Sequence, residues 1–164
     1  MLELIHTLYD YNYWANARIL AVAENLSEAQ FVAPAGMSHG GLRGTLVHAL
    51  AAEWIWRKRC HERVFPTTMM AAAEFPTLAA LRERWQEEET AMRAYVAGLT
   101  EAELNQVVKY TTTSGRPMEN VLWQILVHLI NHGTQTRSEA ALLLTGYGCS
   151  PGDLDLIVYF RDHA

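Results

Sequence analysis

The chain has 164 residues, a length that fits one domain spanning residues 1–164. Half of the residues are hydrophobic, 19% are charged and the formal net charge is -5, which excludes a disordered chain and leaves no basic surface for nucleic acid. Its two cysteines form no Cys-x-x-Cys motif, and no stretch reaches the roughly 18 apolar residues of a membrane helix. Because the N-terminus also lacks a signal-peptide pattern, we expect a cytoplasmic protein without nucleic-acid or membrane partners.

The first third of the chain predicts a long helix and a loop. Residues 2–25 contain no glycine or proline, and their apolar side chains recur at helical spacing. Ser27, with Gln30 three residues later, has the pattern of a capping box and predicts a short helical turn. Residues 33–44 contain Pro34 and several glycines, which indicates a loop.

Two further helices follow. The second is expected to begin between Gly41 and Thr45 and to end near Cys60, and it is apolar on nearly all sides, as is typical of a buried helix. A connection of about 16 residues, 61–76, is long enough to cross the end of a bundle, so a simple up-down order is not required. Thr77 is predicted to cap the third helix, whose charged side faces solvent.

The last third predicts a fourth long helix. Residues 107–113 are rich in β-branched side chains and precede a Ser-Gly turn, so they form either a small hairpin or an extended connection. Pro117 suits the first turn of the fourth helix, which extends to about Thr145, and residues 153–160 predict a short closing helix. We therefore predict an all-α fold, a four-helix bundle with short extra turns.

Three of the seven histidines lie inside apolar helices. His128 and His132 are four residues apart and therefore share one face of the fourth helix, while His48 lies in the buried second helix. An unpaired polar group there costs about 1–3 kcal/mol, so His48 needs a partner. The other four lie near chain ends or in loops and are assigned no role: His6, His39, His61 and His163.

A metal site is one interpretation of this pattern. Three neutral imidazoles can bind a divalent ion and leave positions open for water or substrate. A histidine buried alone is more often only hydrogen-bonded in a core, but three from two buried helices favour a metal ligand set of His48, His132 and His128.

Three segments resemble the DinB family of bacterial proteins, also described as DinB/YfiT-like metalloenzymes. They are Leu8–Asn16 in the first helix, Gly44–Trp54 around His48, and His128–Arg137 in the fourth helix. The similarity extends over nearly the whole chain and keeps the order and spacing of these segments. It implies a four-helix bundle, a homodimer, and a nickel or zinc ion bound by three histidines.

The sequence departs from the family pattern at one ligand position. The family ligands match His48, His132 and the position four residues later, which is Thr136 here. Threonine is a poor ligand because its neutral hydroxyl competes weakly with imidazole. Either His128 acts as the third ligand or the ion is weakly bound or absent. Glu139 is a further oxygen donor to the ion, or a residue that hydrogen-bonds to a ligand and orients it.

Two functions follow as hypotheses. The first is a metal-dependent enzyme that acts on a small electrophile, as the family resemblance implies, with a low-molecular-weight thiol as a second substrate in a transfer or isomerisation. The second is a metal-free bundle that binds a small ligand or a partner. Cys60 follows three basic residues that could activate its thiol, although a partly buried cysteine at a helix end is the favoured interpretation.

Overall fold

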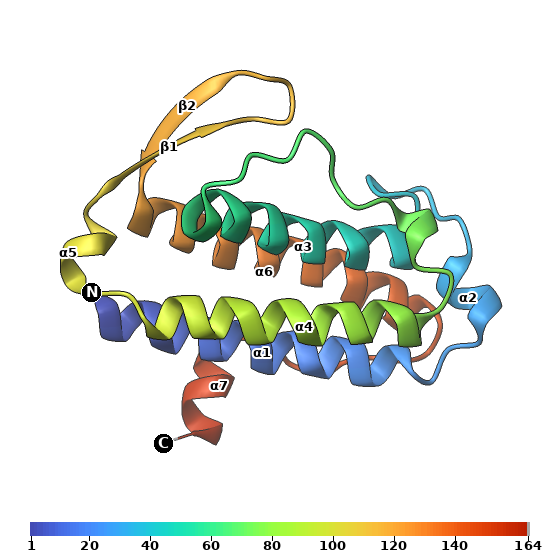
Figure 1. The fold of residues 1–164 in the computed structure, drawn as a ribbon. Helices are drawn as coiled ribbons and strands as arrows, with labels where there is room; N and C mark the ends of the chain where they lie inside the picture. Colours follow the sequence, from blue (N-terminus) through green and yellow to red (C-terminus); the bar gives the residue numbers. More distant parts are fainter. Residues whose placement is uncertain (164) are drawn as a thin grey trace.

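The computed structural model describes residues 1–163 and contains four long helices that lie side by side (Figure 1). These helices are α1 (Leu2–Ala23), α3 (Leu42–Arg57), α4 (Leu78–Ala97) and α6 (Leu122–Gly146). The predicted all-α four-helix bundle is confirmed. Within the described chain, no helix has both the length and the apolar character needed to cross a membrane.

Shorter elements connect and flank the bundle. They are α2 (Glu28–Val32), the π-helical turn η1 (Lys58–Glu62), the 3-10 turn η2 (Ala72–Glu74), α5 (Glu101–Leu104), β1 (Val107–Thr111), β2 (Pro117–Val121) and α7 (Leu156–Asp162). The predicted caps are present. Ser27 and Gln30 form a capping box at α2, and the hydroxyl of Thr77 accepts a hydrogen bond from the first turn of α4.

The prediction that the fourth helix begins at Pro117 is wrong. Residues Pro117–Val121 form strand β2, which pairs antiparallel with β1 in a register that sets Thr111 opposite Pro117. A proline that lacks an N–H is tolerated at the end of such a strand, and the ladder offers these residues hydrogen bonds that a helix start would not. The hairpin alternative for residues 107–113 is therefore the observed one, and α6 begins at Leu122.

The closing helix also begins later than predicted. Expected over residues 153–160, it is observed as α7, Leu156–Asp162. The carboxylate of Asp153 accepts a hydrogen bond from the amide of Asp155 at 3.0 Å. This local turn keeps residues 153–155 out of the helix.

The helices contact one another in the cyclic order α1, α4, α3, α6. α1 and α4 are antiparallel. The Nε2 atom of His6 lies 3.2 Å from the carbonyl oxygen of Val96, and four residues later on α1 the carboxylate of Asp10 lies 2.7 Å from the guanidinium of Arg93, which precedes Val96 on α4. The connection between η1 and α4 returns along the bundle, so that α3 and α4 run in the same direction (Figure 1). The order is consequently not simple up-down, and α3 lies antiparallel to its other neighbour, α6.

A buried ion pair joins α3 to α4. The Nε atom of Arg57 lies 2.5 Å from one oxygen of Glu88 and its Nη2 atom lies 3.0 Å from the other. Glu88 has no solvent exposure, and Arg57 is buried as well. Two parallel hydrogen bonds compensate for the removal of both charges from water and fix the alignment of these helices.

Candidate functional site

The antiparallel packing of α3 and α6 brings His48 and His132 together. Although they are 84 residues apart in sequence, their Nε2 atoms are 2.9 Å apart. The ring centroids are 4.9 Å apart and the rings meet edge to face. Both residues are half-buried, so the pair lies at the edge of the core, within reach of solvent. The partner that His48 was predicted to need is therefore His132.

Both imidazoles of this pair are neutral at pH 7. Burial, reinforced by the nearby His48, His128 and His39, lowers the pKa of His132 to about 4. Burial and His39 also lower the pKa of His48, while the carboxylate of Glu139 acts in the opposite direction. A neutral imidazole has one nitrogen lone pair, which can accept a hydrogen bond or bind a metal.

His39, which was assigned no role from the sequence, also belongs to the histidine cluster. Its ring stacks on that of His48 with centroids 3.8 Å apart and planes inclined by 16°. The backbone of the loop lies so close to α3 that a Cβ atom at Gly44 would collide with the carbonyl oxygen of His39. The density of glycines at positions 40, 41 and 44 is the sequence signal for this close approach.

His128 lies beside the pair. Its ring centroid is 6.0 Å from that of His132 and 5.9 Å from that of Trp56, and the side chain is exposed. Over residues 1–163, no three histidine, cysteine, aspartate or glutamate side chains meet in an arrangement that could hold a metal ion. The structure thus brings two of the three predicted ligands into contact and leaves the third one turn away.

Thr136 and Glu139 occupy the next turns of α6. The hydroxyl of Thr136 is buried and donates to the carbonyl oxygens of His132 and Gly133, both at 3.1 Å. It is therefore engaged with its own helix. The Oε2 atom of Glu139 is buried and has no hydrogen-bond partner among the residues that the structure describes. This carboxylate is near enough to His48 to influence its pKa.

A buried arginine five residues after His132 joins α6 to α1. Arg137, on α6, donates to the side-chain oxygens of Asn12 at 2.5 Å and Asn16 at 2.9 Å, both on α1. A Cβ atom at Gly133 would lie 2.8 Å from the Asn12 oxygen and 2.9 Å from the Arg137 guanidinium, which is tighter than real contacts. Glycine beside His132 therefore lets α1 and α6 approach closely.

Cys60 does not have the environment of a reactive thiol. It is buried, and burial raises the pKa of its thiol to about 12 despite the nearby Arg63 and Arg59. Since the thiolate is the nucleophile, a thiol of this pKa is inert at neutral pH. The interpretation of Cys60 as a structural residue at a helix end is favoured by this geometry.

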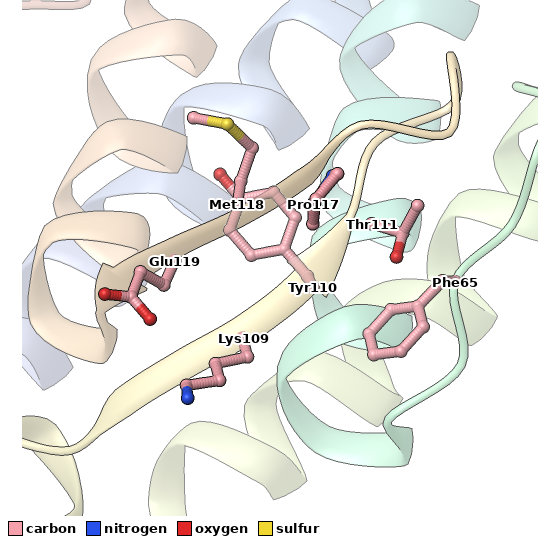
Figure 2. A pocket seen from close by; sticks show the side chains of 7 residues that line it. All are labelled: Phe65, Lys109, Tyr110, Thr111, Pro117, Met118 and Glu119. Carbon is pink, nitrogen blue, oxygen red and sulfur yellow. The ribbon is translucent and has the colours of Figure 1, made fainter.

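Two cavities border the hairpin. One of about 620 Å³ lies between the strands and the connection after α3, and its lining includes Phe65, Lys109 and Glu119 (Figure 2). It contains none of the predicted ligands. The other, of about 320 Å³, is lined by both Trp56 and His128 and so lies next to the histidine cluster.

A family model for the DinB family matches residues 1–162. The chain belongs to the DinB family. Protein DinB of Bacillus subtilis (strain 168) is 25% identical over 171 aligned residues, which cover 97% of this chain and 96% of that protein. The resemblance inferred from the three sequence segments is thus confirmed. In this DinB-family bundle, two of those segments meet at the pair, since His48 comes from one and His132 from another.

Proposed function

We propose that this DinB-family protein binds a divalent metal ion, nickel or zinc, between His48 and His132, and is a metal-dependent enzyme. The observation that supports this most is the 2.9 Å separation of two neutral Nε2 atoms on different helices. Two nitrogens, each about 2.0–2.1 Å from one ion, lie about 2.9 Å apart at the right angle of a square-planar or octahedral site and about 3.3 Å apart in a tetrahedral zinc site, so zinc would require the rings to separate slightly. The donor set therefore suits a borderline metal.

A third ligand is proposed from the side chains that flank the pair. His128 is the ligand predicted from the sequence. Glu139 has a buried oxygen with no hydrogen-bond partner in the described part of the chain, so a ligand role would satisfy it. We favour Glu139 for this reason, since an unpaired buried carboxylate oxygen is costly, and its side chain would have to move toward the pair to complete a three-ligand site. Thr136, whose hydroxyl is bonded to the backbone, is not proposed as a ligand.

The proposed reaction is a transfer or isomerisation in which a low-molecular-weight thiol attacks a small electrophile. A divalent ion at the pair would lower the pKa of a bound thiol or water, or polarise a substrate oxygen. The protein contributes two neutral imidazoles at a half-buried position that solvent reaches in part. The substrate class rests on family resemblance, as does the proposed homodimer, which light scattering at micromolar concentration would test.

Metal analysis of protein purified without a histidine tag tests the proposal. We expect nickel or zinc near one equivalent per chain, lost in His48→Ala and retained in the matched control His163→Ala, because His163 is exposed and distant in the fold. Restoring the family ligand by Thr136→His should raise the affinity. A metal-free protein whose melting temperature does not respond to added zinc or nickel would overturn the proposal.

A second function is favoured by the same distance. A separation of 2.9 Å is also that of an imidazole N–H donating to the lone pair of a second imidazole. The pair would then be a hydrogen-bonded element of a metal-free bundle that binds a small ligand. Unaltered stability in the presence of metal, together with binding of a small molecule, would support this alternative.

A further inference from the structure

A row of positions at four-residue spacing continues on α3 and α6 from the histidine pair toward the hairpin. Because residues four apart share a helix face, each helix contributes three positions to it. They are His48, Ala52 and Trp56 from α3, and Gln124, His128 and His132 from α6. These positions lead from the pair, past His128, toward the hairpin.

At the hairpin end of this row lies the cavity of about 320 Å³. Its walls come from α3, the hairpin and α6, and are formed by Trp56, Tyr110, Asn120, Gln124, Ile125 and His128. The ring of His128 lies between the cavity and the pair, since it is near both Trp56 and His132. A molecule in the cavity would therefore have the pair beside it.

The walls of this cavity are aromatic and amide groups. Trp56 and Tyr110 meet edge to face with centroids 4.9 Å apart and offer flat apolar surface. Asn120 and Gln124 add amide NH₂ groups that can donate, while their oxygens already accept hydrogen bonds from the Tyr110 hydroxyl at 2.8 Å and the Val121 amide at 3.3 Å. The lining includes no carboxylate, lysine or arginine. Such walls suit a planar ligand and provide no counter-charge for a cation.

Arg59, next to the cavity walls, adds to the selectivity of the cavity against cationic ligands. The Arg59 guanidinium lies 4.9 Å from the Trp56 ring centroid and 5.3 Å from that of Tyr110. Of the three consecutive basic residues, Arg57 and Lys58 are paired with carboxylates, whereas Arg59 is buried against the aromatic rings. Its positive charge, poorly screened in this setting, repels a cationic ligand.

We propose that this cavity binds a planar small molecule without a positive charge, held against Trp56 and His128 with one end toward the His48–His132 pair. That the pair then acts on the bound molecule rests on the proposed function, whereas binding in the cavity does not. In this arrangement His128 contacts the ligand and is not the third metal ligand.

Indole and tryptamine are matched probes, because they share a ring system and only tryptamine carries an ammonium group at pH 7.5. Each probe is titrated into the full-length protein and binding is followed by NMR chemical shifts. We expect the dissociation constant of indole to be at least tenfold lower than that of tryptamine. His128→Ala should weaken indole binding about two- to tenfold, the range of an aromatic contact, and Trp56→Leu should do the same. The control Val127→Ala, exposed beside His128 on α6, should leave it unchanged.

Metal content of the same variants separates the two proposals. Retained metal with weakened indole binding in His128→Ala supports the assignment. Loss of metal in His128→Ala would make His128 a ligand and overturn its place in the cavity. If wild-type protein binds indole but no metal, the proposed function fails and the cavity assignment holds. No detectable indole binding, or tryptamine binding as tight as indole, overturns the cavity assignment itself.

Discussion

Glu53 offers a quantitative test of the bundle interior. It is buried on α3 and accepts a hydrogen bond from the hydroxyl of Tyr13. Burial raises its pKa from 4.5 to about 7, although the Tyr13 hydrogen bond acts in the opposite direction. Since one pKa unit is worth about 1.4 kcal/mol, this difference corresponds to about 3 kcal/mol of stability.

The sign of the effect follows from proton binding. Between pH 4.5 and about 7 the folded protein keeps the Glu53 proton that the unfolded chain has released. The stability that protonated Glu53 gives to the folded protein is therefore fully present below pH 4.5 and is lost as the pH rises to about 7. Glu53→Gln cannot ionise and keeps an oxygen for the Tyr13 hydroxyl. Relative to the wild type, this variant should gain about 3 kcal/mol between pH 4.5 and 8.

Urea denaturation followed by circular dichroism at several pH values measures this difference, because the other titrating groups are common to both proteins and cancel. The exposed Glu83→Gln on α4 is the control, and its difference from wild type should stay within about 0.5 kcal/mol. A raised pKa of Glu53 would be refuted if the difference in unfolding free energy between Glu53→Gln and the wild type did not change with pH, or if it fell as the pH rose.

Two further substitutions test other contacts. Glu88→Leu leaves Arg57 buried without its main partner and should cost about 3 kcal/mol in urea denaturation, whereas the double change with Arg57→Met should recover most of this loss. Gly44→Ala should displace the loop that carries His39, because the added Cβ collides with its carbonyl oxygen. We expect a loss of about 1–3 kcal/mol in the free energy of unfolding and altered NMR resonances of the His39 ring. The control is Gly36→Ala in the same loop, which should stay close to wild type because a Cβ atom there meets open space.

Local signals were sufficient to predict most of the fold. The absence of glycine and proline over residues 2–25 and the capping residues Ser27 and Thr77 located helices that the structure contains. The start of α6 could not be predicted in this way. Pro117 is compatible with a first helical turn and with a strand end, and pairing with residues 107–111 decides between them. That pairing is a contact between segments, which helix-start rules do not include.

The candidate site was predicted only in part, for a related reason. Spacing correctly places His128 and His132 on one side of α6, but it does not say which of them faces α3. The structure turns His132 toward His48 and leaves His128 exposed beside Trp56. His39 was missed because a loop residue has no periodicity. Its position depends on the close approach of its backbone to Gly44.

The cluster that joins α1 to α6 has a consequence for how the site responds to its surroundings. Arg137 is held by the amide oxygens of Asn12 and Asn16, neither of which can gain or lose a proton, and an arginine stays protonated in proteins. The register between these helices is therefore set by groups that do not titrate. Glu53 changes its charge near neutral pH and interacts electrostatically with Arg137, but the hydrogen bonds that join Arg137 to α1 contain no group that changes its charge there.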